Sequence, residues 1–489
     1  MTNYKKKNID IIINHAKVYG FIFKSSEIYN GIKSIYDYGP NGIEMKNNIK
    51  NFWWDYMVKY RDNIVGVDTS ILMNNKVWDA SGHKKNFYEY FIINYYNKKI
   101  YILEELLNFI LYKINNKNNI KINNIKINNI KIKFLKLFKK KKIKKLNIFF
   151  KKKIIKYNLS KILKWDKIKK INLMFKTKIN SFKKKEYTYL RPETAQGIFV
   201  NFKNIKNSNR MKIPFGIAQI GKSFRNEIIS KQFIFRIKEF EQMEMQFFIF
   251  PGEEKKWYKY WIKSRLEWHY FLNLGKNKYR IKDHKNLSHY TTFATDIEFK
   301  FFDSFKELEG IHFRKDFDLK NHQKLSKKNL KYFDIKSNKK FFPYVIETSL
   351  GLDRIFYSIF YSSIKIQKIN NKKRIYLKLP FFISPIKIAI LPLIKKGKII
   401  NISKKIFNNL KYKYYIVYDD KDSIGKRYRR QDAIGTPYCI TIDNKSVINK
   451  TVTIRNRDTM KQINYKIKNI NKYFKKNFDI SNFFKKKII

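Results

Sequence analysis

The stretch from Phe215 to Phe248 constrains the fold of this chain more than any other. Two runs rich in Phe and Ile, Phe215 to Phe224 and Phe233 to Phe248, flank a polar loop near residues 226–232, which is the spacing of two antiparallel strands joined by a long connection. Because strand side chains alternate between two faces, the hairpin is predicted to have one polar face. That face carries Gln219, Gly221, Ser223 and Arg225 on the first strand, and Arg236, Lys238, Phe240, Gln242, Glu244 and Gln246 on the second.

The charges on this face follow an order along the second strand. Two cations come first, then an aromatic ring, then a carboxylate, so a ligand could meet phosphate-binding, base-stacking and ammonium-binding groups in turn. A simpler interpretation is an antiparallel sheet that buries one side and exposes the other to water. Motifs in and around the hairpin favour the first interpretation.

Several segments together resemble the class II aminoacyl-tRNA synthetases, in the form found in homodimeric glycyl-tRNA synthetases of bacterial type. FRNE and FRIKEFEQME of residues 224–227 and 235–244 resemble the second signature motif of that family. The other matching segments are SSEIY through DYGPNG (residues 25–42, first motif), RPETAQG (191–197), KELEGIHFRKDFDL (306–319) and PYVIETSLGLDRIFYSIF (343–360, third motif). Seven consecutive matching residues in RPETAQG are hard to obtain by chance.

The resemblance implies an α+β fold, with a class II antiparallel sheet flanked by helices and a C-terminal α/β anticodon-binding domain. The catalytic domain would span residues 1–384, interrupted by a basic low-complexity insertion at 91–186, and the anticodon-binding domain would span 385–489. Pro40 would be structural and would face a second subunit. Helical spacing is predicted for residues 8–19 and 43–58, with Trp53 and Trp54 on the buried side and a turn at residues 38–42.

The resemblance also assigns site residues. Arg225 and Arg354 would be the catalytic residues. The expected ATP-binding residues are Arg225, Asn226, Glu227, Phe235, Arg236, Phe240, Glu307, Leu308, Gly351, Asp353 and Arg354. The expected glycine-binding residues are Glu193, Phe240, Glu241, Gln242, Glu244, Arg314, Glu347, Ser349 and Gly351. Glu307 would also lie near a magnesium ion, so ATP and Mg²⁺ are expected alongside glycine and its tRNA.

Two carboxylates, Glu193 and Glu244, would hold the ammonium group of glycine. This pairing makes physical sense, because burying either carboxylate without a partner costs several kcal/mol. Glu193 taken alone could equally be a helix-capping residue. The sequence departs from the family pattern at Ile100, where an arginine is expected, at Thr348, where proline is common, and at Leu350, where a smaller residue is expected. Leu350 could narrow the amino-acid pocket or move the backbone.

The charge of the chain is extreme, with 107 Lys and Arg against 39 Asp and Glu, a formal net charge of +68. An anionic partner such as tRNA is one explanation. Drift of an A/T-rich genome is another, because the surplus Lys accompanies a surplus of Ile, Asn, Phe and Tyr. The sign of the charge suits tRNA under either explanation.

A reducing, cytoplasmic setting is expected, because the single cysteine, Cys439, excludes an intramolecular disulfide. The first residues lack the apolar core of a signal peptide, and no run approaches the ~18 apolar residues of a membrane span. These features predict a soluble protein.

Residues 91–186 are rich in Lys, Ile and Asn and contain no Gly or Pro. They could form a basic arm that touches RNA or a decayed insertion kept soluble by lysine, with ordered strands or an amphipathic helix possible in either case.

After Pro380, strand-like runs at 386–391, 414–418, 438–442 and 452–455 alternate with helix-length segments. There Lys426, Arg427, Arg429 and Arg430 lie at a predicted helix start, where phosphate contacts are easily made.

The motifs predict ATP-dependent attachment of glycine to tRNA through a glycyl-adenylate. A catalytically inactive, synthetase-like protein that binds nucleic acid is the main alternative, and retention of Arg225, Glu227 and Arg354 argues against it. A basic RNA-binding scaffold fits the composition but not the RPETAQG or FEQME segments. A class II synthetase for another amino acid is disfavoured by the set Glu193, Glu244 and Ser349.

Overall fold

The computed structural model describes residues 2–115, 124–140, 142–179, 186–228, 233–284, 293–302, 304–369, 371–481 and 484. Its contacts divide the chain into two units. Unit 1 consists of Met1–Ile71, Glu193–Ser223 and Gln232–Ile489, and unit 2 of Leu72–Pro192 and Phe224–Lys231. Each unit has a hydrophobic core of its own.

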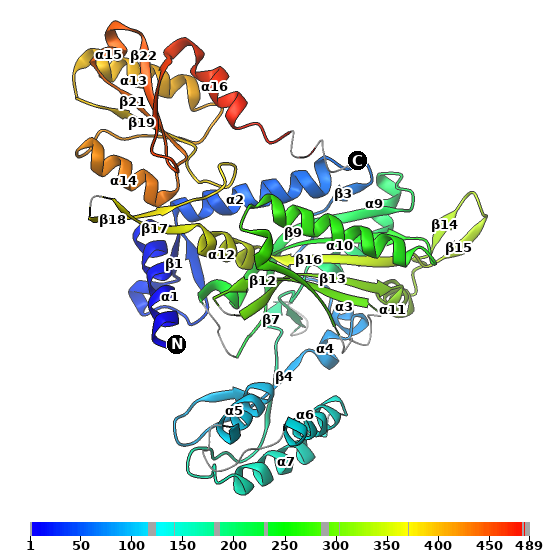
Figure 1. Ribbon diagram of the computed structural model, residues 1–489. Helices are drawn as coiled ribbons and strands as arrows, with labels where there is room; N and C mark the ends of the chain where they lie inside the picture. The colour runs from blue at the N-terminus through cyan, green and yellow to red at the C-terminus, as the bar shows by residue number, and fades with distance from the viewer. Residues whose placement is uncertain are drawn as a thin grey trace. The chain divides into compact units, whose positions relative to one another are not determined.

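Unit 1 is built on a seven-stranded sheet (Figure 1). In spatial order its strands are β11 (Tyr279–Asp283), β12 (Phe293–Phe301), β13 (Ser304–Lys315), β16 (Tyr344–Gly351), β10 (Glu239–Ile249), β9 (Phe215–Phe224) and β3 (Ile64–Gly66). The pairs from β11 through β10 are antiparallel, and β3 runs parallel to β9. The predicted antiparallel sheet is therefore present.

The hairpin prediction is right for the first strand and partly wrong for the second. β9 covers Phe215–Phe224 as predicted, but β10 begins only at Glu239, because Phe233–Phe235 forms a 3-10 turn, η3. Ile234 and Ile237 are both buried, and their spacing of three residues belongs to a turn rather than to a strand. Arg236 and Lys238 therefore precede the strand instead of sharing its polar face. Part of the loop, residues 229–232, lies outside the described residues.

Helices cover one face of this sheet. α10 (Glu254–Phe271) packs on β13 and β16, and α12 (Leu352–Ser363) contacts β10 and α2 (Pro40–Trp54). The predicted turn at residues 38–42 is instead the start of α2, where Pro40 occupies the first position, since proline has no N–H to leave unpaired there. Trp53 is buried as predicted, whereas Trp54 is half-buried. The predicted helix near the N-terminus is α1 (Thr2–Val18).

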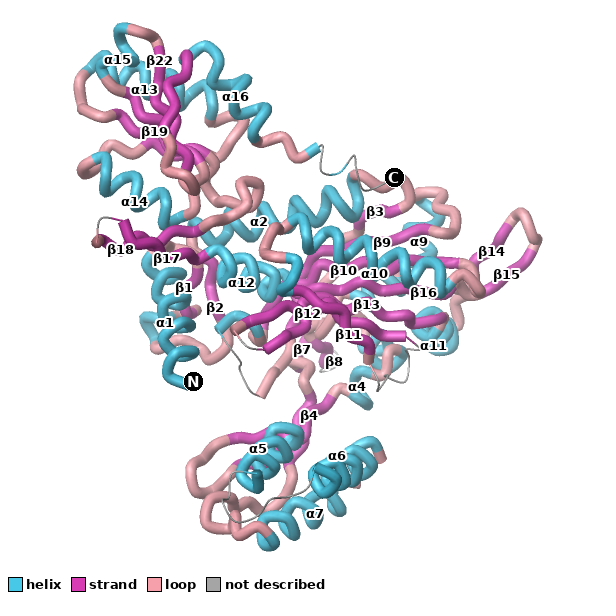
Figure 2. The backbone as a smooth tube through the Cα atoms, viewed as in Figure 1, coloured by secondary structure: helices cyan, strands magenta, loops and turns pink. Residues whose placement is uncertain are grey.

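Unit 2 contains most of the predicted low-complexity insertion, and its described residues are folded. A three-stranded sheet is formed by β5 (Ile100–Ile102), β4 (Tyr88–Ile93) and β6 (Lys169–Asn172), and three helices follow β5: α5 (Leu103–Asn115), α6 (Asn124–Lys139) and α7 (Ile143–Lys156) (Figure 2). On α7 the buried residues recur at helical spacing, at Leu146, Phe149, Phe150 and Ile154, while the lysines face solvent. The ordered strands and amphipathic helices that the sequence allowed are therefore present in the described part of this segment. Residues 116–123, 141 and 180–185 of the segment lie outside the description.

The C-terminal part of unit 1 has the predicted α/β layout. Its sheet has the order β20 (Ile416–Tyr418), β19 (Ile388–Pro392), β21 (Tyr438–Ile442), β22 (Thr451–Asn456) and β23 (Gln462–Lys466). β23 is an addition that the sequence did not indicate. The helices of this part are α13 (Gly397–Leu410), α14 (Ile424–Ile434), α15 (Asn444–Ile448) and α16 (Ile470–Asn477), and a hairpin of β17 (Ile364–Ile369) and β18 (Lys372–Leu377) precedes it.

A bilayer crossing needs a long apolar helix. The part of the chain that the structure describes contains none.

Candidate active site

Strands β10 and β16 bring two buried glutamates together. Their register sets Glu244 opposite Ser349 and Gln246 opposite Glu347, so all four residues share the face of the sheet opposite α10. The Gln246 amide donates from Nε2 to Glu244 Oε1 at 2.7 Å and to Glu347 Oε2 at 2.9 Å. Both hydrogens of this neutral amide are used to join two carboxylates.

Strand β13 supplies the cations of this face. Arg314 donates from Nη1 to Glu347 Oε2 at 2.8 Å and to Asp318 from Nε and Nη2 at 2.8 and 3.0 Å. His312 Nδ1 lies 3.0 Å from Glu347 Oε1. Burial alone would raise the pKa of Glu347, but the charge of Arg314 and the contact with His312 lower it to about 2. Glu347 is therefore ionised and already has its charge compensated.

The start of α8 (Ala195–Val200) adds the third glutamate. Gln196 Nε2 donates to Glu193 Oε1 at 2.9 Å and to Asp318 Oδ1 at 3.0 Å, and the Thr194 hydroxyl donates to Glu244 Oε2. Glu193 is half-buried, whereas Glu244 is 1% exposed.

Glu244 has other carboxylates as neighbours on this face. The four carboxylates of Glu193, Glu244, Asp318 and Glu347, here named the carboxylate cluster, meet the guanidinium of Arg314 and the ring of His312. Burial, followed by the charges of Glu347 and Glu193, raises the pKa of Glu244 well above its ordinary value. A small cation beside Glu244 would stabilise its ionised form and offset the repulsion from the neighbouring carboxylates. An ammonium group could supply that charge.

Beside the carboxylate cluster lie further residues expected to bind glycine. Gln242 accepts from the Ser223 hydroxyl at 2.7 Å and donates to Ser349 Oγ at 3.3 Å, and Gly351 stands opposite Gln242 in the register. Phe240 is half-buried on β10, two residues before Gln242 on the same face.

The side chains of Glu241 and Asp353 contact lysines of α2 and do not face the carboxylate cluster. This corrects the expected roles of Glu241 in glycine binding and of Asp353 in ATP binding. Lys46 of α2 lies 2.6 Å from Glu241 Oε2 and 3.5 Å from Asp353 Oδ1, and Lys50 lies 3.6 Å from Glu241. Asp353 also accepts from the Tyr38 hydroxyl and from the backbone N–H of Glu241, the latter at 2.9 Å. Because neighbouring residues of a strand point to opposite faces, Glu241 cannot line the same face as Gln242 and Glu244. The two carboxylates instead tie α2 to β10 and α12.

Arg354 is partly exposed at the start of α12. Its guanidinium lies 4.8 Å from the centre of the Phe235 ring, and its Nη1 lies 3.1 Å from Glu307 Oε1. Leu308 is 1% exposed in the main core, so only its backbone can face a ligand. Arg354, Phe235 and Glu307 thus form a cation–ring–carboxylate group suited to a nucleotide phosphate and base.

Arg225, Asn226 and Glu227 belong to unit 2. Arg225 Nε donates to the carbonyl of Pro192 at 3.0 Å, and its guanidinium lies 5.5 Å from the centre of the Phe87 ring. Asn226 is anchored by its backbone N–H, which donates to the carbonyl of Leu173 at 2.7 Å. These contacts fix the segment within its own unit, and its role at a nucleotide stays a prediction from the sequence.

Two of the departures from the family pattern lie on the α10 face of the sheet. Leu350 is 1% exposed in the main core and Thr348 is also 1% exposed, and they pair in register with Met243 and Met245. Of the two effects considered for Leu350, its side chain therefore does not narrow the space beside Ser349. Ile100, the third departure, is half-buried in β5 of unit 2.

The basic helix of the C-terminal part contributes fewer phosphate-binding groups than expected. Arg427 is 3% exposed and donates to the carbonyls of Pro392 and Asp419, so its role is structural. Arg430 pairs with Asp419 at 2.8 Å. Lys426 and Arg429 remain exposed on α14.

Sequence reasoning placed Gln246 on the polar face of the hairpin but gave it no role at the site. It missed four other residues that hold the carboxylate cluster in place: Thr194, Gln196, His312 and Asp318. A signal existed for Asp318, which follows Arg314 at the i+4 spacing. The other three reach the cluster only through the tertiary fold.

Two family models match parts of this chain. The family model described as "tRNA synthetase class II core domain (G, H, P, S and T)" matches residues 175–362, and the model described as "Anticodon binding domain" matches residues 387–477. The chain is 43% identical over 471 residues to the glycine–tRNA ligase of Borrelia hermsii, covering 95% of this chain and 96% of that protein. It is 42% identical over 458 residues to the glycine–tRNA ligase of Chlorobaculum tepidum, covering 92% and 96%.

Among solved structures, the prolyl-tRNA synthetase of Giardia lamblia in complex with prolyl-adenylate is similar to this chain with a TM-score of 0.61. The match covers 96% of this chain and 75% of that one at 14% identity, which shows a shared fold.

Proposed function

Because this chain belongs to the glycine–tRNA ligase family of class II aminoacyl-tRNA synthetases, we propose that its carboxylate cluster binds the ammonium group of glycine during ATP-dependent charging of tRNA. One observation carries the proposal: Glu244 is 1% exposed, accepts hydrogen bonds from the neutral donors Thr194 and Gln246, and has a pKa raised by burial and by the neighbouring carboxylates of Glu347 and Glu193. Glu193 and Glu244 bind the ammonium group. Thr194 and Gln246 donate hydrogen bonds to Glu244, and Gln196 donates one to Glu193, so these three residues hold the two carboxylates in position.

In the first chemical step the glycine carboxylate attacks the α-phosphate of ATP, which forms glycyl-adenylate and releases pyrophosphate. The protein contributes position and charge rather than proton transfer. Arg354, beside Phe235 and Glu307, suits the outer phosphates. The proposal also carries four roles from the family motif: Arg225 at the α-phosphate, Glu227 at the adenine amino group, Phe240 stacked on the base and Arg236 at the outer phosphates.

Magnesium fits the residues at this end of the sheet. The carboxylate of Glu307 is exposed beside Arg354. A single exposed carboxylate suits Mg²⁺, which often takes one or two protein carboxylates and otherwise water and substrate phosphates. Bound there beside Glu307, Mg²⁺ would neutralise phosphate charge.

In the second step a ribose hydroxyl at the tRNA 3′ end attacks the adenylate. The C-terminal domain, residues 385–489, is proposed to bind the anticodon arm, with Lys426 and Arg429 available for phosphate contacts. Selectivity for glycine needs only steric exclusion, since every competing amino acid is larger. A cytoplasmic site of action is proposed, consistent with the reduced, buried Cys439.

A homodimer is part of the proposal. Ile28, Tyr29 and Ile32 are 88%, 80% and 58% exposed in the segment before α2, and Pro40 is exposed at its start. An apolar group of this kind is unusual on the surface of a monomer. Light scattering should give twice the chain mass, and a variant with Ile28→Asp and Tyr29→Asp should shift toward the monomer.

Glycine-dependent exchange of pyrophosphate into ATP tests the activation step. We expect exchange with glycine and little with alanine or serine. Equal exchange with all three would refute the assignment of the carboxylate cluster as a selective site. Absence of exchange together with tRNA binding would instead support the catalytically inactive alternative, which the comparisons do not favour.

A further inference from the structure

The β17–β18 hairpin belongs to neither of the two regions matched by family models, which end at residue 362 and begin again at residue 387. It follows directly on α12, the helix that carries Arg354 in its first turn. Its strands pair antiparallel along their whole length, from Ile364 opposite Leu377 onward. The hairpin is thus a short, regular element between the central sheet and the C-terminal domain.

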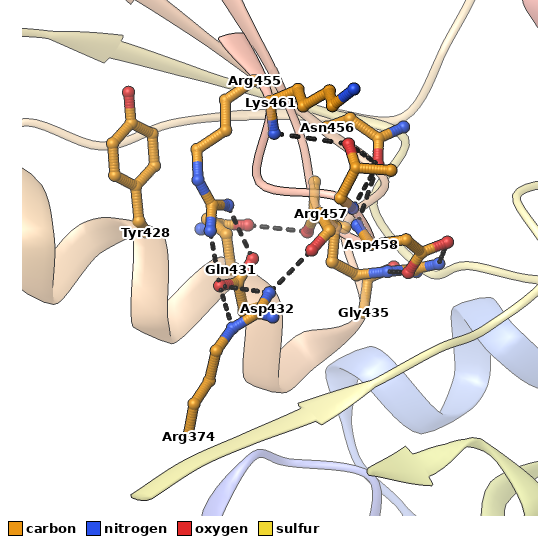
Figure 3. Close-up of polar contacts among 12 residues, drawn as sticks. Arg374, Tyr428, Gln431, Asp432, Gly435, Arg455, Asn456, Arg457, Asp458 and Lys461 are labelled. Atoms are coloured by element: carbon orange, nitrogen blue, oxygen red, sulfur yellow. Dashed lines mark hydrogen bonds and ion pairs between the residues drawn. The ribbon is translucent and has the colours of Figure 1, made fainter. Parts of the chain in front are cut away.

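Arg374 of this hairpin reaches into the C-terminal domain. It is 7% exposed, and its Nε and Nη2 lie 3.0 and 2.8 Å from Asp432 Oδ2 on α14. Arg455 of β22 binds the same carboxylate through two parallel contacts, of 2.8 and 3.0 Å. Figure 3 shows Asp432 held by the two guanidinium groups, one from the hairpin and one from the C-terminal sheet.

Further contacts fix the same end of α14. Arg457 donates from Nη1 to the carbonyl of Gly435 at 2.6 Å and from Nη2 to the carbonyl of Leu379 at 2.8 Å, in the segment that follows the hairpin. His15 of α1 contacts the carbonyl of Ala433 at 2.8 Å. The first half of α14, in contrast, presents Lys426 and Arg429 to solvent.

The charge of Asp432 is compensated by arginines, whereas Glu244 has neutral donors and carboxylate neighbours. Asp432 is 1% exposed; Arg455 binds both of its oxygens in the bidentate geometry that favours rigid pairing, and Arg374 contacts Oδ2 through two nitrogens. A buried, fully paired carboxylate has no capacity left for a ligand, and the arrangement of such a group specifies geometry more than it adds stability.

We propose that Arg374 is a positioning residue for the transfer of glycine to tRNA. It fixes the C-terminal end of α14 to the hairpin that extends from α12, and so sets where Lys426 and Arg429 lie relative to Arg354. The inference rests on the proposed function. It predicts that the junction matters for the step that uses tRNA and not for the formation of glycyl-adenylate.

Arg455 offers a matched control, since it pairs with the same carboxylate from within the C-terminal sheet. We compare Arg374→Gln, Arg455→Gln and the wild type by pyrophosphate exchange and by tRNA charging, with thermal unfolding recorded for each. Exchange should stay within about twofold of wild type in both variants, because it needs no tRNA. The KM for tRNA should rise about tenfold in Arg374→Gln and less than about threefold in Arg455→Gln.

Arg374→Lys is the second variant, should the glutamine variant not fold. It keeps the charge but replaces the two contacting nitrogens, Nε and Nη2, by a single ammonium group, so an intermediate KM for tRNA is expected. Equal rises in Arg374→Gln and Arg455→Gln, an unchanged KM in Arg374→Gln, or a loss of exchange that matches the loss of charging would each overturn the proposal. A wild-type protein without glycine-dependent exchange would overturn the proposed function itself, and is recognised by that first assay.

Discussion

Strand β13 supplies charged residues to both faces of the central sheet. On the α10 face, Glu309 lies 2.6 Å from Arg265 Nε and 2.9 Å from His269 Nε2, and all three side chains are 0% exposed. On the opposite face, His312 and Arg314 of the same strand meet the carboxylate cluster.

The two faces differ in their balance of charge. Burial would raise the pKa of Glu309, but Arg265 and His269 lower it, so this carboxylate is ionised and paired within the protein. Glu244 has Thr194 and Gln246 as neutral donors and other carboxylates as neighbours, and its pKa is raised. A compensated buried charge therefore indicates a structural role, whereas an uncompensated one indicates a ligand.

The largest effect is expected from Glu309→Gln. The substitution leaves Arg265 charged, buried and without its carboxylate, which should cost about 3–5 kcal/mol of unfolding free energy. Denaturant unfolding measures it. If the variant remains folded, its KM for glycine should be unchanged, and a raised KM would contradict the separation of the two faces.

Glu244→Gln should reduce activity and leave stability intact, which is the opposite of the result expected for Glu309→Gln. It removes a carboxylate proposed to bind the ammonium group, so kcat/KM for glycine should fall about a hundredfold. The melting temperature should stay the same or rise, because the change also removes repulsion from Glu347 and Glu193. A variant that is both inactive and strongly destabilised would show that Glu244 is a structural residue like Glu309.

The pH dependence of glycine binding sharpens the comparison further. Because the pKa of Glu244 is raised, protons occupy it in the empty site at pH values where an ordinary glutamate is ionised. The KM for glycine should therefore fall as pH rises through the raised pKa of Glu244. The free energy of unfolding should decrease over the same rise in pH. A carboxyl group whose pKa is raised in the folded state contributes stability at low pH, and this contribution is lost as pH rises through that pKa. A KM that is independent of pH, measured by exchange, would contradict the raised pKa.

The smallest effect concerns Thr348, a departure from the family pattern on the α10 face. Its buried hydroxyl has no hydrogen-bond partner among the described residues. Thr348→Val keeps the shape and removes the unsatisfied group, so it should stabilise the protein by about 1 kcal/mol and leave kcat and KM unchanged. A loss of activity would mean that this position does reach the substrate face.

The sequence predicted the fold well where local pattern decides it. The alternation along β10 placed Gln242, Glu244 and Gln246 on one face, and the motif resemblance identified the family. The same alternation places Glu241 on the face opposite to that of Phe240 and Gln242. It therefore already argued against Glu241 as a glycine-binding side chain.

Other parts of the site could not be predicted in this way. His312, Thr194 and Gln196 take their roles from contacts with residues 35, 50 and 122 positions away. The 3-10 turn at Phe233–Phe235 and the packed helices of unit 2 depend on which apolar residues become buried. The lysine-rich composition of unit 2 does not show which of its apolar residues these are.

A crystal structure with a non-hydrolysable glycyl-adenylate analogue tests the central claim most directly. The account predicts that the ammonium nitrogen lies about 3 Å from carboxylate oxygens of Glu193 and Glu244, the distance of a charge-assisted hydrogen bond. An ammonium group bound away from both glutamates, with Glu244 still enclosed by Thr194 and Gln246 alone, would contradict it.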